Sequence, residues 1–337
     1  MSGSDETLAE ATAIQGSLPR DLSAYQPHAF HATDRDWPET NCYVDLWIEI
    51  LNGRGLEVAA MFPFTFASDF EGDQWTFYKP PHADLFLLYG IEVEELTVWK
   101  ALAAHCVEQV GRGRMPLVEM DSYFLPDTRG RAYRETHTKT TVGVVGIDPE
   151  RRRLRYFHNR GLFELEGSDY DGLFRSAPAA NDSVLAPYCE FAKFDRLIQR
   201  ESSDLRERTR ELLRRHLGRR PERNPIRRYA ERIDEHLSWL IEDREEHYDL
   251  YAFAAIRQCG SCFAFSADCL RWLGEDDERW LKPAEAFSSL SSVASMLVMK
   301  MARIVYSGRL ADLQAPFTEM AEAWDRGMEE VDQRVAP

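Results

Sequence analysis

Segments that favour β-strands are confined to the first half of this 337-residue chain. Residues 115–124, 138–147 and 154–158 are rich in β-branched and aromatic residues, and the turn-like Asp148-Pro149-Glu150 joins the second segment to the third. After residues 177–181 these signals end, and apolar residues recur at the spacing of α-helices. The asymmetry predicts an α+β protein, in which an antiparallel sheet is followed by an all-α helical bundle.

The same change of pattern sets the expected domains. Residues 1–25 are polar and predict a loose N-terminal arm. Residues 26–178 predict a domain that contains the sheet and would hold any catalytic residues of the Cys/His type, and residues 179–337 predict a helical domain. Besides the strands above, the first domain is expected to contain helices at 41–51 and 94–110 and strands at 58–66, 74–78 and 161–165. The second is expected to contain helices near 191–198, 229–241, 249–273, 288–306 and 317–331.

Composition excludes several classes of protein. The net charge of −16 argues against general nucleic-acid binding, because phosphate contacts require a positive surface. The apolar runs are too short to span a bilayer, and the polar N-terminus does not resemble a secretory signal. Six cysteines at irregular spacing suggest no disulfide framework, as is typical of a reducing compartment. We therefore expect a soluble, cytoplasmic protein without membrane contact.

One stretch departs from the acidic balance, because arginines outnumber acidic residues between Arg196 and Arg232. The simplest interpretation is a solvated helix face on which side chains four residues apart form ion pairs. The alternative interpretation is a docking surface for an acidic protein partner. The residues assigned to such a surface are Arg214, Arg215, Arg227 and Arg228.

Cys42 is a candidate nucleophile because it lies at the predicted start of the first helix. Thr40 or Asn41 is a suitable N-cap, which places Cys42 in the first helical turn. Backbone N–H groups at the positive end of the helix dipole stabilise a thiolate and can hold a developing oxyanion. The alternative interpretation is a small residue buried beneath the cap. Asn41 and Tyr43 are the neighbouring candidates for oxyanion or substrate binding.

A cysteine nucleophile requires a base, and His137 immediately precedes a predicted strand. The base in turn requires a residue that fixes its tautomer. Asn159 is the first choice, since its amide oxygen can accept the imidazole N–H, while His158 and Asp148 are the alternatives. Further polar residues near the same end of the sheet are expected to line a substrate site: Asp121, Tyr123, Asp127 and His158.

A second cysteine pattern is expected to be structural. Cys259 and Cys262 have the CxxC spacing that is used for zinc or redox chemistry, and Cys269 follows. They lie in an apolar helix without a second ligand pair, and the three positions fall near one helical face, which favours core packing. The histidines show no metal-ligand spacing, and no glycine-rich phosphate loop is present. We expect no metal site and no cofactor bound by this chain.

The stretch from residue 112 to residue 126 carries a family resemblance. Its glycine, proline, apolar strand, Asp-Ser-Tyr and Leu-Pro resemble the butirosin-biosynthesis acyltransferase-like domain, a papain-like fold related to bacteriocin-processing cysteine peptidases. The resemblance continues through His137 to Tyr156-Phe157-His158-Asn159, and it includes Cys42 at the start of its helix. It implies a papain-like N-terminal domain. The usual acidic third residue is replaced here by His158-Asn159.

Nearly the whole chain also resembles a bacterial domain-of-unknown-function family. The shared motifs are Leu125-Pro126-Asp127-Thr128, His137-Thr138-Lys139-Thr140-Thr141 and the segment that ends in Asn159. Members of this family are often encoded beside amino-acid:carrier-protein ligases. The resemblance therefore implies that the partners are a carrier protein and, as a second candidate, such a ligase.

Together these resemblances imply acyl or aminoacyl transfer. Cys42 would take the group from a phosphopantetheine thioester on an acyl or aminoacyl carrier protein, and His137 would act as base. A small-molecule amine or thiol would accept the group, and the arginine-rich helices would bind the acidic carrier. Two alternatives stay open: a thioesterase or amidase that uses the same residues, and a non-catalytic adaptor that binds the carrier protein.

Overall fold

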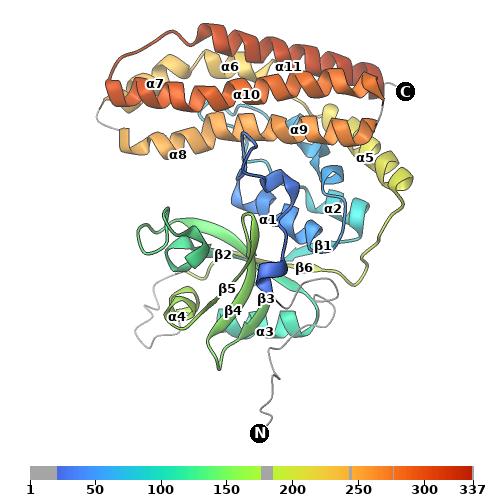
Figure 1. Cartoon of the computed structure of the whole chain (residues 1–337), viewed down its shortest axis with the longest axis vertical. Helices are drawn as coiled ribbons and strands as arrows, with labels where there is room; N and C mark the ends of the chain where they lie inside the picture. Colours follow the sequence, from blue (N-terminus) through green and yellow to red (C-terminus); the bar gives the residue numbers. More distant parts are fainter. Residues whose placement is uncertain (1–20, 176–184, 243–244, 276, 336–337) are drawn as a thin grey trace. The chain divides into compact units, whose positions relative to one another are not determined.

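The computed structural model describes residues 21–175, 185–242, 245–275 and 277–335. The fold is α+β, with one six-stranded antiparallel sheet and with helices that lie mostly in the C-terminal half (Figure 1). The chain forms two compact units and passes between them more than once. The described residues of Met1–Thr33, Asn41–Glu57 and Leu85–Gln199 form the sheet unit, and those of Asp34–Thr40, Val58–Asp84 and Arg200–Pro337 form the helical unit.

The sheet has the strand order β1-β6-β2-β3-β4-β5, and every neighbouring pair is antiparallel. The predicted strands at 115–124, 138–147 and 154–158 are confirmed, as are the hairpin after the second of them and the extension at 161–165. The strands are β1 (Glu92–Glu95), β2 (Met115–Asp121), β3 (Lys139–Asp148), β4 (Arg153–His158), β5 (Gly161–Glu166) and β6 (Cys189–Lys193).

Helix α1 (Cys42–Asn52) packs against β3 and β4, in agreement with the predicted helix at 41–51. Gly143 of β3 permits this close approach, because a methyl group there would lie 3.1 Å from Leu46 Cδ1 of α1. The remaining helices around the sheet are α2 (His82–Tyr89), which begins in the helical unit, α3 (Leu102–Gly111) and α4 (Ser168–Phe174).

The strands predicted at 58–66 and 74–78 are wrong. Residues Ala59–Ala67 form a 3-10 helix, η3, and the second segment contributes only an isolated bridge between Phe70 and Trp75. Pro63 within η3 lacks the N–H that a strand ladder requires. The aromatic side chains of this segment instead fill the core of the helical unit, where Phe62 stacks on Phe265 with a centroid separation of 4.3 Å.

The helix predicted near 191–198 is also wrong, because β6 occupies this region between β1 and β2. The predicted helix at 94–110 begins later than expected, since its first residues belong to β1. The expected domain boundary after residue 178 and most of the expected N-terminal arm, residues 1–20, lie outside the described residues. Strand β6 follows that boundary but belongs to the sheet unit.

In the helical unit, α10 packs along α9 and α11 (Figure 1). Cys259, Cys262 and Cys269 of α9 are buried, and burial raises the pKa of Cys262 to about 12. The helices are α5 (Ser202–Leu217), α6 (Pro225–Ala230), α7 (Ile233–Ile241), α8 (Tyr248–Ala252), a π-helical turn (Phe253–Arg257), α9 (Gln258–Gly274), α10 (Glu278–Ser307) and α11 (Gln314–Val335).

Among the described residues, α10 is the one helix long and apolar enough to cross a membrane. Within its most apolar window, 44% is buried inside the protein. The buried side includes Phe287, which stacks on Phe263 of α9. Such a helix is typical of the centre of a helical bundle.

Candidate functional site

Cys42 is the first residue of α1, where the sequence places it. Asn41 is the N-cap, and its side-chain oxygen accepts a hydrogen bond of 3.0 Å from the Val44 N–H. The Cys42 Sγ is partly exposed and lies 3.8 Å from Thr141 Oγ1 of β3, whereas the other five cysteines are buried. The accessible thiol of the chain therefore lies at the positive end of a helix.

His137 is in contact with an acidic partner. Its Nδ1 lies 2.6 Å from Asp121 Oδ2, and the Tyr123 ring stacks on the imidazole with a centroid separation of 4.4 Å. The Tyr123 N–H also donates to Asp121 Oδ1. With 68% of its side chain exposed, His137 is reachable from solvent. A carboxylate at Nδ1 leaves Nε2 as the nitrogen that can exchange a proton with a substrate.

Cys42 and the His137–Asp121 pair lie toward the same face of the sheet. Cross-strand partners point to the same side, and Asp121 pairs with Lys139, two residues before Thr141. However, the four residues from His137 to Thr141 span about 13 Å at the rise of an extended strand. The structure describes both Cys42 and His137, and no hydrogen bond joins their side chains.

Neither Asn159, the first choice of orienting residue, nor Asp148, one of its alternatives, forms a hydrogen bond or ion pair with His137 among the described residues. Asn159 is the first residue of the two-residue turn between β4 and β5, and its φ of 43° lies in the left-handed region that asparagine tolerates. Asp148 ends β3, at the opposite end of that strand from His137, and its Oδ1 accepts a hydrogen bond from the Arg151 N–H. The residue bonded to His137 is Asp121.

His158 belongs to a buried network with Asp127. Its Nδ1 lies 2.6 Å from Asp127 Oδ2 and its Nε2 lies 2.7 Å from Thr140 Oγ1, while Tyr156 OH donates to Asp127 Oδ1 at 2.5 Å. Only 1% of the His158 side chain and 4% of the Asp127 side chain are exposed. This network attaches the turn that follows β2 to strand β4. Its inaccessibility makes a direct role in catalysis a poor fit.

The side chain of Tyr43 also has a structural partner. Tyr43 OH donates to Glu190 Oε2 of β6 at 2.7 Å, and Tyr188 OH donates to Glu190 Oε1 at 2.9 Å. Burial and the nearby Glu190 carboxylate raise the pKa of Tyr43. The phenol thus anchors α1 to β6 in its protonated form, and the backbone of Tyr43 is the part that suits an oxyanion role. The role of Glu190 as a partner of Tyr43 could not be recognised from the sequence, because the sequence did not predict strand β6.

A recess of about 240 Å³ adjoins Asp121 in the sheet unit. Its polar wall includes Glu119, the cross-strand partner of Thr141, whose carboxylate binds Lys139 Nζ at 2.8 Å. The recess therefore adjoins the carboxylate that binds His137, while Met120, the cross-strand partner of Thr140, places part of its wall on the face opposite Cys42. Its apolar wall includes Val98, Leu102, Met120, Phe124, Leu173 and Phe174.

In the described ranges, no group of three or more histidine, cysteine, aspartate or glutamate side chains is suited to hold a metal ion. The site is accordingly built from a thiol and an imidazole–carboxylate pair.

The four arginines assigned to a docking surface all have partners within the helical unit. Partly buried Arg228 is the most constrained, since it contacts the Asp69 carboxylate and donates to the Phe70 carbonyl at 2.8 Å. The other contacts are Arg214 Nε to Val335 O at 3.1 Å, Arg215 to Asp84 at 3.6 Å and Arg227 to Asp325 at 2.5 Å.

Several arginines of α5 bind the carbonyl ends of other helices. Arg206 donates to Trp272 O and Arg210 donates to Leu273 O, both in the last turn of α9. Arg214 serves the end of α11 in the same way. Cations stabilise helix C-termini because the last carbonyls lack intrahelical partners. The arginine-rich composition is therefore explained largely by helix packing.

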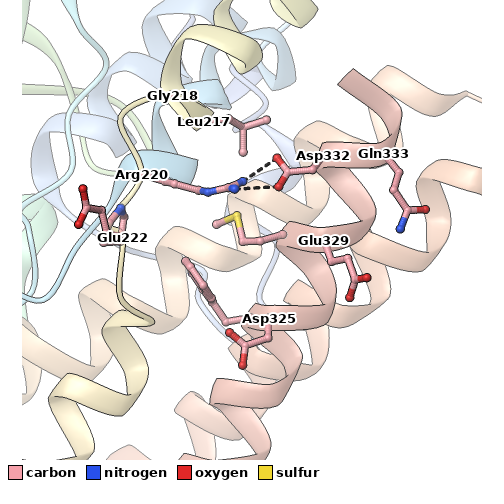
Figure 2. Close-up of a pocket in the computed structure, with 11 residues that line it drawn as sticks. Leu217, Gly218, Arg220, Glu222, Asp325, Glu329, Asp332 and Gln333 are labelled. Atoms are coloured by element: carbon pink, nitrogen blue, oxygen red, sulfur yellow. Dashed lines mark hydrogen bonds and ion pairs between the residues drawn. The ribbon is translucent and has the colours of Figure 1, made fainter. Parts of the chain in front are cut away.

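A larger recess of about 810 Å³ lies beside these helices, and Figure 2 shows the side chains that line it. Arg220 forms a bidentate ion pair with Asp332, with distances of 2.6 and 2.7 Å. Glu222 and Glu329 add negative charge to the lining, while Asp325 is paired with Arg227. An acidic partner would be repelled from this part of the helical unit.

The fold and the site define a two-unit α+β protein that presents a cysteine at a helix start. The chain belongs to the DUF1839 family: the DUF1839 N-terminal domain matches residues 26–194 and the DUF1839 C-terminal domain matches residues 202–333. None of the curated proteins matches the chain. The two matches meet near Gln199, where the sheet unit ends.

Proposed function

We propose that this chain is a cytoplasmic, papain-like acyltransferase. It takes an acyl or aminoacyl group from the phosphopantetheine thioester of a carrier protein and passes it, through Cys42, to an amine or thiol. One observation carries the proposal: an accessible thiol opens α1 on the same face of the sheet as the exposed His137–Asp121 pair. This combination supplies a nucleophile, a base and a residue that orients the base.

The proposed reaction has two halves. His137 Nε2 accepts the Cys42 proton, and the thiolate attacks the thioester carbonyl while backbone N–H groups of Cys42 and Tyr43 hold the oxyanion. The bond to the pantetheine sulfur breaks, and that sulfur takes the proton from His137. An amine or thiol then attacks the Cys42 thioester and gives its proton to His137, which returns it to the Cys42 sulfur as that bond breaks.

Because Cys42 and His137 are separated, this mechanism requires a way to transfer the proton between them. The imidazole must move toward the thiol, or a water must relay the proton, when substrate is bound. His137 is suited to movement, because it precedes β3 and most of its side chain is exposed. Asp121 and Tyr123 would guide the ring through the hydrogen bond at Nδ1 and the stacking contact.

The same separation favours a second candidate function, a non-catalytic adaptor that binds the carrier protein. In the described structure the hydrogen-bond partner of Cys42 is Thr141, and the thiol is not paired with a base. An adaptor would show no dependence of any reaction on Cys42.

The proposal is tested by turnover of an acyl-pantetheine thioester, which is measured as the free thiol released. We expect Cys42→Ala and His137→Ala to abolish turnover, and Asp121→Asn to slow it by about 10- to 1000-fold. Asn159→Gly, which suits the left-handed φ, is the matched control and should retain the rate. Turnover that survives in Cys42→Ala would exclude the proposal. Turnover that is unaffected by added amines or thiols would indicate the hydrolase.

A further inference from the structure

One face of α10 exposes large apolar side chains to solvent. Met296, Met299 and Tyr306 are 64%, 70% and 62% exposed, although most of the large apolar residues of α10 are buried. Their spacings of three and seven residues place them on one side of the helix. Apolar residues gathered on one face often mark an interaction site, and methionine is common where a surface must adapt to a partner.

The same face is positively charged. Lys300 and Arg303 lie between the apolar residues, and the sequence from 286 to 311 contains no aspartate or glutamate. Lys300 Nζ donates to a backbone carbonyl, that of Asp312, and among the described residues Arg303 takes part in no ion pair. The next acid, Asp312, accepts a hydrogen bond from the Gln314 N–H at its side-chain oxygen, and within the described ranges neither Lys300 nor Arg303 forms an ion pair with a carboxylate.

This property distinguishes α10 from the arginine-rich helices. Arg227 and Arg228 are held by carboxylates of the helical unit, so their charges are largely compensated. A cationic, apolar helix face complements a partner that presents carboxylates around apolar side chains.

We propose that the α10 face, defined as Met296, Met299, Lys300, Arg303 and Tyr306, is the docking surface for the acidic carrier protein. The identity of the partner rests on the proposed function. Acidic side chains of the carrier would face Lys300 and Arg303, and its apolar side chains would cover Met296, Met299 and Tyr306. The four arginines of α5 and α6 would then serve the fold and not the docking.

Binding can be measured without any chemistry. The probe is a fluorescently labelled acyl carrier protein that carries phosphopantetheine but no acyl group, titrated with the full chain and followed by anisotropy. Lys300→Glu/Arg303→Glu should weaken binding at least about tenfold in about 0.05 M salt, and the difference should shrink in about 0.5 M salt. Met299→Ser should weaken binding at both salt concentrations, because it removes apolar contact.

The matched control is Lys282→Glu/Arg326→Glu, which reverses two exposed charges elsewhere in the helical unit. It should bind the carrier within about twofold of the unmodified chain. Equal losses in both double variants would overturn the proposal, as would no loss in either. A dimer in light scattering that Met299→Ser dissociates, or stronger binding to vesicles containing anionic phospholipid than to the carrier, would also overturn it.

Two further measurements separate this proposal from the proposed function. Cys42→Ala should bind the carrier as the unmodified chain does, since docking needs no thiol. Lys300→Glu/Arg303→Glu should keep full turnover of a small acyl-pantetheine thioester, which makes no protein–protein contact. Loss of carrier binding in Cys42→Ala, or loss of small-thioester turnover in the α10 variant, would contradict the separation of docking from chemistry.

Discussion

Thr140 and Thr141 are adjacent in β3 and serve opposite faces of the sheet: Thr140 Oγ1 contacts His158, and Thr141 Oγ1 contacts Cys42. Successive side chains of a strand alternate between faces. The two histidines of the candidate site are thereby separated. His158 is held in the interior on one side, and the His137 pair remains as the base on the side of Cys42.

This arrangement predicts different outcomes for two matched substitutions. Thr140→Val should lower the free energy of unfolding by about 1–3 kcal/mol, because it leaves buried His158 without a partner at Nε2. Thr141→Val should cost less, since its contact is a weak bond to a partly exposed thiol, and should change the reactivity of Cys42. Denaturant unfolding and thiol alkylation measure the two effects. Equal stability losses would contradict the assignment of faces.

Alkylation should discriminate among the six cysteines. Cys42 should react with iodoacetamide much faster than the others, because it is accessible while the others are buried. Burial also raises the pKa of Cys189 and of Cys262 to about 12, so their thiols stay protonated at neutral pH. Peptide mapping by mass spectrometry gives the rates. A rate at Cys42 no greater than at Cys189 would remove the physical support for a nucleophile.

Substitution of the two aspartates that contact histidines should affect the stability of the protein differently. Asp121→Asn should leave the free energy of unfolding within about 0.5 kcal/mol, since its contacts are near the surface. Asp127→Asn should cost about 1–3 kcal/mol, because it disrupts the buried bonds to His158 and Tyr156. Denaturant titration of both variants, alongside thioester turnover, measures this. A stable Asp127→Asn with impaired turnover would instead place the buried network in the reaction.

The arginine contacts change the expectation for charge reversal in α6. Arg227→Glu/Arg228→Glu should lower the free energy of unfolding by roughly 1–3 kcal/mol, since Arg228 bonds to Asp69 and to the Phe70 carbonyl in a partly buried setting. Arg223→Glu, at a position 70% exposed, should have little effect. Thermal unfolding compares them. An unchanged melting temperature in the α6 variant would show that these contacts contribute little.

Local sequence patterns predicted the parts of the fold that local interactions determine. The helix that begins at Cys42 follows from its Asn41 cap, and the β3–β4 hairpin follows from Asp148-Pro149-Glu150. Strand β6 was missed because its partners β1 and β2 lie about 70 or more residues earlier in the chain, and a local pattern cannot reveal such pairing. The aromatic segment 58–66 was misassigned because packing in the helical unit overrides its strand propensity.

In the candidate site, too, local sequence predicts some features, while others depend on contacts between distant parts of the chain. Helix capping places Cys42, and a strand start places His137, so both positions could be inferred from sequence. The Asp121 contact could not, because it depends on the register of β2 against β3. Asn159 has the right chemistry for an orienting residue, but a turn at positive φ explains its presence. The pairing of the arginines likewise depends on tertiary packing.

The most direct test of the account is intact-protein mass spectrometry of the full chain after mixing with an acylated carrier protein and rapid acid quenching. We expect a mass increase equal to one acyl group, located on the peptide that contains Cys42, absent from Cys42→Ala and released when an amine or thiol acceptor is added. Asp121→Asn should accumulate the adduct more slowly. A chain that binds the carrier but never gains mass, or gains it equally in Cys42→Ala, would contradict catalysis through Cys42.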